Sequence, residues 1–141
     1  MSRTRIPADL WSLVQSRAVG FCEYCGIHED DAFEAHEADH IIAEQHGGET
    51  TAENLAFACW QCNRRKGPNL SSIDPESREI VRLFHPRQDR WREHFRIEGA
   101  RIVTLTPIGR ATAGLLRLNS PENLILRTAL CEGGRYPMRG P

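Results

Sequence analysis

Four cysteines form two pairs with the same spacing, Cys22-x-x-Cys25 and Cys59-x-x-Cys62. Each pair can place two thiolates on one metal ion, and two such knuckles together complete a tetrahedral zinc site. Two disulfides or a redox-active Cys-x-x-Cys are the alternatives. No apolar signal segment precedes the first pair, so we expect a reducing, cytoplasmic compartment. Structural Zn²⁺ is therefore the favoured interpretation of the four thiols.

Ligands of a different kind lie close to these cysteines in the sequence. Asp39 offers a carboxylate oxygen and Asn63 an amide oxygen, and hard oxygen donors suit Mg²⁺ or Mn²⁺. Beside Asp39, His40 is a side chain that can accept a proton near neutral pH. A general base next to a hard cation is the combination that phosphodiester hydrolysis needs.

Each of these residues also has an ordinary interpretation. His40 alone could be a satisfied histidine on a strand, Asn54 a turn residue and Asn63 a helix cap. Their joint occurrence in one order, together with four cysteines, favours a functional site.

This order of motifs resembles the HNH endonucleases. The matching motifs, which lie within residues 21–70, are Asp39-His40, Gly47-Gly48, Asn54-Leu55 and Cys59-x-x-Cys62-Asn63-x-x-Lys66-Gly67. The resemblance implies an α+β fold with a ββα-metal core, here with a four-cysteine zinc site.

The resemblance also implies roles for individual residues. Asp39 and Asn63 would bind the catalytic Mg²⁺ or Mn²⁺, and His40 would be the general base. Asn54 would brace the loop and orient the histidine. Asn63 stands where many members of the family have histidine, and its amide still offers an oxygen.

The distribution of charge points to nucleic acid as a partner. Residues 1–60 carry 11 acidic and 3 basic side chains, whereas residues 61–141 carry 8 acidic and 15 basic ones. A net charge of −1 therefore conceals an acidic half and a basic half. Arg64, Arg65 and Lys66 follow directly after Asn63, and we expect them to contact the DNA backbone. RNA remains open as a substrate, as does the oligomeric state, and no apolar run approaches a membrane span.

The elements that must position these residues can be read from the same sequence. Residues 6–19 predict a helix, residues 34–42 a strand and residues 55–58 a second strand. A short helix should begin at Asn63. Because neighbouring residues in a regular strand face opposite sides, a bulge or strand end near Asp39 is expected.

The remaining sequence predicts an extension to the core. We divide the chain into a zinc-braced core with its N-terminal helix (residues 1–70), an α+β extension packed on it (71–131) and a disordered tail (132–141). The extension should contain strands near 92–97 and 101–105 and helices near 109–118 and 121–131. Its aromatic residues Phe84, Trp91 and Phe95 are expected in the core rather than against bases.

Together these expectations describe a metal-dependent endonuclease that hydrolyses DNA. A zinc-stabilised nucleic-acid-binding module without cleavage is the main alternative. A protein-interaction domain that uses the zinc fold as a scaffold is a further one.

Overall fold

The computed structural model describes residues 5–137 of the chain. Its α-helices are α1 (Ala8–Ala18), α2 (Trp60–Lys66), α3 (Trp91–His94), α4 (Pro107–Leu116) and α5 (Pro121–Glu132). Short 3-10 turns lie at η1 (Glu29–Asp31), η2 (Glu44–His46) and η3 (Ala52–Asn54). The strands are β1 (Glu37–His40), β2 (Leu55–Ala58), β3 (Ser71–Ile73), β4 (Ile80–Arg82), β5 (Phe95–Glu98) and β6 (Arg101–Thr104). Within the described residues they pair as three antiparallel two-stranded sheets.

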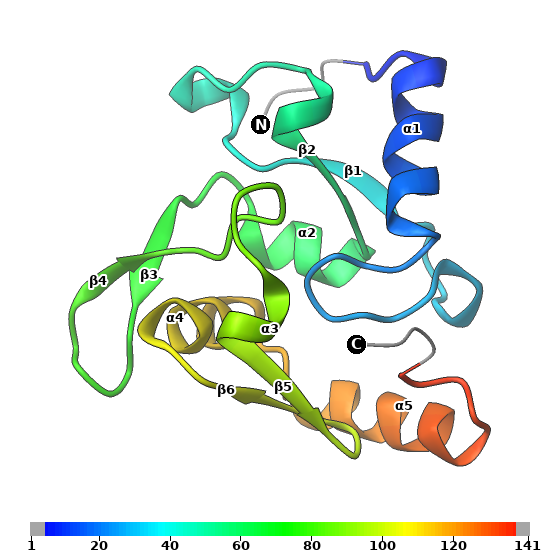
Figure 1. Ribbon diagram of the computed structural model, residues 1–141, viewed down its shortest axis with the longest axis vertical. Coiled ribbons are helices and arrows are strands. Elements are labelled where there is room, and N and C mark those ends of the chain that lie inside the picture. The colour runs from blue at the N-terminus through cyan, green and yellow to red at the C-terminus, as the bar shows by residue number, and fades with distance from the viewer. Residues whose placement is uncertain (1–4, 138–141) are drawn as a thin grey trace.

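The β1–β2 hairpin and α2 form the centre of the site-bearing part of the molecule (Figure 1). The hairpin is held between two helices, with α1 covering one face and α2 lying against β1. On the α1 side, Val14 and Ala18 are buried against Leu55 and Phe57. A short hairpin is not stable alone, so helices on both faces supply the burial that it needs. The predicted α+β class and ββα core are confirmed.

Helix α1 agrees closely with its predicted range. Pro7 precedes its first turn, and Asp9 lies in that turn, where a carboxylate favours the helix dipole. The helix ends at Ala18, and the next residue, Val19, adopts a left-handed conformation with φ 54°.

Helix α2 begins at Trp60, three residues before the predicted start at Asn63, and this corrects the sequence interpretation. The reason is the knuckle itself, because Cys59 caps the helix by accepting a hydrogen bond from the Cys62 amide at 3.4 Å. Asn63 is therefore the middle residue of α2 rather than its first.

Strand β1 pairs regularly with β2 along its whole length, from Glu37 opposite Ala58 to His40 opposite Leu55. No bulge occurs at Asp39. The sequence predicts either a bulge or a strand end near Asp39, and the structure has a strand end, at His40.

The extension packs on the core through α4, which lies against α2 and against the β3–β4 hairpin. Phe84 and Phe95 are buried with their ring centroids 5.6 Å apart, and Trp91 lies against Phe95, as predicted for core aromatics. Strands β5 and β6 and helices α4 and α5 occur where the sequence predicts them, with boundaries shifted by up to three residues.

The C-terminal residues that the structure describes pack against the core, which differs from the disorder expected for residues 132–141. Tyr136 is buried, and its hydroxyl donates to the Cys25 carbonyl at 2.8 Å. Residues 138–141 lie outside the described range. Among the described helices, none has the length and apolar character needed to cross a membrane.

Candidate active site

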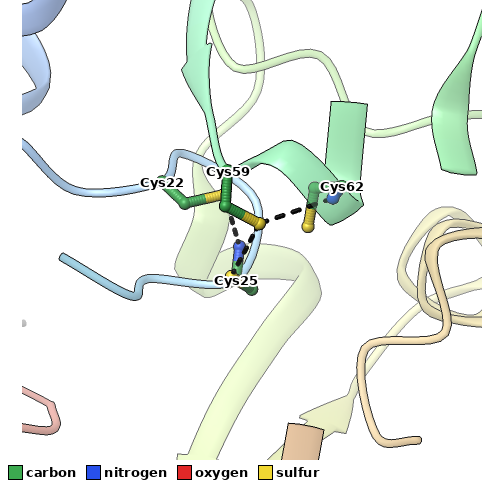
Figure 2. A group of neighbouring side chains, drawn as sticks. All are labelled: Cys22, Cys25, Cys59 and Cys62. Atoms are coloured by element: carbon green, nitrogen blue, oxygen red, sulfur yellow. Dashed lines mark hydrogen bonds between the residues drawn. The ribbon is translucent and has the colours of Figure 1, made fainter. Parts of the chain in front are cut away.

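The four cysteines converge on one buried point (Figure 2). Cys22 and Cys25 lie in the turn after α1, while Cys59 and Cys62 lie at the junction of β2 and α2. Their sulfur atoms all lie within 4.8 Å of one another. None is in a disulfide.

This geometry fits a tetrahedral zinc ion. Four thiolates at about 2.3 Å from zinc have sulfur atoms about 3.8 Å apart, and the Cys25 and Cys59 sulfurs are 3.8 Å apart. Burial opposes ionisation of Cys22, but thiol hydrogen bonds from its three neighbours outweigh it and hold its pKa well below the usual range. Hydrogen bonds with the neighbouring thiols raise the pKa values of Cys25 and Cys62 well above the usual range, so ionisation is not favoured at every thiol of the cluster. Four buried thiols at this spacing nevertheless have the ligand chemistry of a structural zinc site.

A separate groove of about 590 Å³ opens beside the end of β1. Its lining includes Asp39, His40 and Asn63, the residues that the sequence predicts as metal ligands and base. Glu37 and Arg64 also line it. The groove therefore collects hard oxygen donors and a histidine away from the thiolates.

Asp39 is almost fully buried, and both of its oxygens have polar neighbours. The Tyr24 hydroxyl donates to Oδ2 at 2.8 Å, and Lys66 Nζ lies 3.3 Å from Oδ1. Burial raises the pKa of Asp39 above its usual value, opposed by the charge of Lys66 and by both hydrogen bonds. Burial and the nearby Asp39 charge raise the pKa of Tyr24 well above its usual value, so it remains a donor.

Lys66 is buried, unlike a residue that contacts DNA from the protein surface. Its side chain is 2% exposed, and its ammonium group also donates to the His40 carbonyl at 3.1 Å. A buried polar side chain needs such hydrogen-bond partners. This placement corrects the expectation that Lys66 holds the DNA backbone, and it makes Lys66 a partner of Asp39.

His40 is partly buried and faces Thr50 on the loop that joins the two strands. Its Nε2 lies 2.8 Å from Thr50 Oγ1. Its Nδ1 has no hydrogen-bond partner within residues 5–137. One ring nitrogen therefore contacts Thr50, and the other bonds to no described residue.

Asn54 braces the loop between β1 and β2. Its amide nitrogen donates to the carbonyls of Ile42 and Glu49, at 2.9 and 2.8 Å, and its Oδ1 accepts from the Ile42 amide at 2.9 Å. The loop passes so close at Gly48 that an added Cβ would lie 1.7 Å from the Ile42 carbonyl oxygen. These contacts hold the loop that carries Thr50, and the role of Asn54 in orienting His40 stays a prediction.

The cations of α2 differ from one another in what they contact. Arg64 is partly exposed and pairs with Glu37 at 2.7 Å. Arg65 donates to the carbonyls of Leu116 and Arg117 at the end of α4. Of the three basic residues that follow Asn63, Arg64 is the one that lines the groove.

Sequence reasoning missed three residues of this site: Tyr24, Glu37 and Thr50. Glu37 had a detectable signal, since it lies two residues before Asp39 and shares its face of a strand. Tyr24 and Thr50 gave none, because each reaches its partner through a loop whose path the sequence does not specify.

The groove contains the oxygen donors that a hard divalent cation prefers. Asp39 supplies carboxylate oxygens, and Asn63 lines the same groove with an Oδ1 that accepts no hydrogen bond from residues 5–137. These are the ligand types that Mg²⁺ and Mn²⁺ use, whereas the thiolates are a distinct, softer set.

Comparison with family models matches residues 22–69 to the model described as HNH endonuclease. The chain therefore contains an HNH endonuclease domain, which spans the first knuckle, the β1–β2 hairpin and α2. The matched range agrees with residues 21–70, where the motifs place the resemblance. Neither the search of curated proteins nor that of solved structures finds a match.

Proposed function

We propose that this protein is a metal-dependent endonuclease that hydrolyses phosphodiester bonds of DNA. The observation that carries the proposal is the groove, in which His40 and the oxygen donors of Asp39 and Asn63 meet beside a braced loop. HNH family membership independently suggests nuclease activity.

In this proposal His40 is the general base. If Nε2–H donates to Thr50 Oγ1, then Nδ1 keeps its lone pair and can take a proton from water at the groove. Asn54 holds the loop so that this tautomer and ring orientation persist. The water oxygen then bonds to phosphorus as the bond from phosphorus to the leaving 3′ oxygen breaks. The His40 ring carries the proton taken from the water, and the leaving oxygen takes a proton from solvent.

Asp39 and Asn63 would hold the catalytic Mg²⁺ or Mn²⁺, which when bound supplies charge stabilisation of the phosphate and the leaving oxygen. Tyr24 and Lys66 keep Asp39 in one orientation through their contacts with its two oxygens. A structural Zn²⁺ held by the four cysteines would have a different task, which is to join the turn after α1 to the start of α2.

DNA contact in this proposal relies on Arg64 and on the basic second half of the chain. Arg64 lines the groove and is partly exposed, and its contact with Glu37 uses two of the five N–H donors of the guanidinium group, so the others can contact a phosphate. Arg65 has a smaller part, because its guanidinium group already binds main-chain carbonyls.

Incubation of supercoiled plasmid with the zinc-loaded protein tests the proposal. We expect nicking with Mg²⁺ or Mn²⁺ and none with EDTA at a concentration that leaves the zinc content unchanged. Loss of a general base typically costs about 10²–10⁴-fold in rate, so His40→Ala should lose nearly all activity.

His46→Ala is the matched control, because His46 lies on the loop that follows His40 and is exposed, and its side chain bonds only to the Pro68 carbonyl among the described residues. It should retain nicking. Full activity in His40→Ala would remove His40 as the base. Salt-sensitive binding of plasmid without cleavage under any metal would favour the zinc-stabilised binding module instead, and a parallel assay on RNA identifies the nucleic acid.

A further inference from the structure

We propose that Glu37 is a positioning residue that sets the orientation of the Asn63 amide, so that Oδ1 is the atom offered to the catalytic metal. This inference rests on the proposed function, since it concerns the same metal site. Nothing in the HNH motif itself assigns a role to Glu37.

The backbone places Glu37 opposite Asn63. Glu37 and Asp39 are two residues apart on a regular strand, so their side chains share one face. Helix α2 lies against β1, and there the Asn63 amide comes within 2.6 Å of Glu37 Oε1. The same strand face therefore supplies Asp39 as a donor to the metal and Glu37 as a partner for the other ligand.

The chemistry of this contact decides which amide atom faces Glu37. An ionised carboxylate can only accept hydrogen bonds, so the Asn63 atom that faces it must be the NH₂ group. The reverse orientation would place two oxygens 2.6 Å apart, which is repulsive. Oδ1 is then the free acceptor of a side chain that lines the groove.

Glu37 is itself held from its other side. Arg64 donates to both of its carboxylate oxygens, at 2.7 and 3.2 Å, and the Arg64 guanidinium lies 5.0 Å from the centroid of the Trp60 ring. Such a forked contact fixes the plane of the carboxylate. A side chain fixed on one side by Arg64 can impose an orientation on Asn63 on the other.

A direct ligand role for Glu37 is the competing explanation, and the two differ in a measurable way. Oε1 already accepts from two donors, Asn63 and Arg64, so ligation would require at least one of them to leave. A residue that acts through Asn63 has no effect once Asn63 is removed. A residue that binds the metal itself has an additional effect.

The test is a double-mutant cycle measured as Mn²⁺ affinity of the zinc-loaded protein by electron paramagnetic resonance. Its members are the wild type, Glu37→Ala, Asn63→Ala and the double variant. Loss of a residue that orients a ligand typically costs about 10- to 100-fold in metal affinity, and we expect that loss for Glu37→Ala. The double variant should bind Mn²⁺ as weakly as Asn63→Ala and no more weakly.

Glu37→Gln is the conservative variant, since its side-chain oxygen can still accept from Asn63. It should recover most of the affinity lost in Glu37→Ala. Zinc content and thermal unfolding of each variant verify that the core is folded, which is expected because the Glu37 side chain is 33% exposed.

Wild-type Mn²⁺ affinity in Glu37→Ala, or additive losses in the double variant, would overturn the inference. Plasmid nicking by the same wild-type preparation separates this failure from that of the proposed function. Metal-dependent nicking with an unaffected Glu37→Ala variant removes only the role of Glu37. If the wild type neither binds Mn²⁺ nor nicks plasmid, both the role of Glu37 and the proposed function are wrong.

Discussion

Asp39 illustrates how one residue can be both a ligand candidate and a structural group. Its carboxylate is buried between Tyr24 and Lys66, where leaving either oxygen without a partner would be costly. The same two partners prevent rotation of the carboxylate. A donor that cannot rotate is suited to hold a metal in one geometry.

The contact between Thr50 and His40 leads to a prediction at the same scale. Thr50→Val keeps the shape of the side chain but removes the hydroxyl that lies 2.8 Å from His40 Nε2. The net worth of one hydrogen bond is about 0.5–1.5 kcal/mol, so kcat for nicking should fall by about tenfold or less. KM for DNA should not change, because Thr50 is proposed to act on the base and not on the phosphate.

Thr50→Ser restores the hydroxyl and serves as the control. Recovery of kcat in Thr50→Ser identifies the hydrogen bond as the cause. An equal loss of kcat in both variants would mean that the methyl group of Thr50, and not its hydroxyl, is what matters.

At the scale of elements, the loop from residue 41 to residue 54 decides where the groove is. It leaves β1 at His40 and returns to β2 at Leu55, and Asn54 binds it at both Ile42 and Glu49. The Gly47–Gly48 pair lets the chain turn tightly against that asparagine. Gly47 adopts φ 88°, and Gly48 lies too close to the Ile42 carbonyl for a side chain.

We therefore predict that Gly48→Ala disrupts both stability and activity. The added Cβ would lie 1.7 Å from the Ile42 carbonyl oxygen and 2.9 Å from Asn54 Nδ2, so the backbone must move. Overpacking of this kind costs about 1–3 kcal/mol, which thermal unfolding would detect as a lower Tm. Nicking should fall as well, since the displaced loop carries Thr50.

Gly114→Ala is the matched control, because Gly114 is inside α4 and an added Cβ there meets nothing within 4 Å. It should raise stability by about 0.5–1 kcal/mol through helix propensity and leave nicking unchanged. A Gly48→Ala variant with wild-type Tm and activity would contradict the proposed bracing of this loop.

At the scale of the whole molecule, a polar pair joins two elements of the extension, and one of these elements packs on the core. Asp74, after β3, is fully buried and accepts two hydrogen bonds from Arg110 on α4, at 2.8 and 3.0 Å. Helix α4 in turn packs on α2, which carries Asn63. This pair therefore links the β3–β4 hairpin to the helix that supports the site.

The pair predicts a specific dependence of stability on pH. Hydrogen bonds from Arg110 hold the pKa of Asp74 well below its usual range, against the opposing effect of burial. Because the folded-state pKa is depressed, the stabilisation is present above the unfolded-state pKa of about 3.9 and is lost as the pH falls below it. Thermal unfolding of Asp74→Asn should show a lower Tm than wild type at pH 7, with a difference that shrinks below about pH 4.

Glu79→Gln is the control, since it removes the same charge from an exposed residue of the same hairpin. Its Tm should follow that of the wild type across the whole range. A constant Tm difference between Asp74→Asn and wild type from pH 7 to pH 3 would show that the ion pair is not the source of the effect.

Several features of this protein follow from its sequence alone. The paired cysteines predict one metal cluster because ligand spacing within each knuckle is local, and the strands at Glu37–His40 and Leu55–Ala58 follow from local pattern and turn residues. Helix α2 begins three residues before its predicted start because its capping group is a cysteine, which is not a usual cap.

Only the tertiary structure decided the partners of the site residues. Lys66 turns inward to Asp39, Glu37 faces Asn63, and Tyr136 returns from the C-terminal end of the described chain to the carbonyl of Cys25. Each of these contacts joins residues that are far apart in the sequence. Local pattern predicts which face of an element a side chain occupies, but the packing of elements determines which polar group it meets there, because a buried charge or hydroxyl must find a partner wherever the chain brings one within reach.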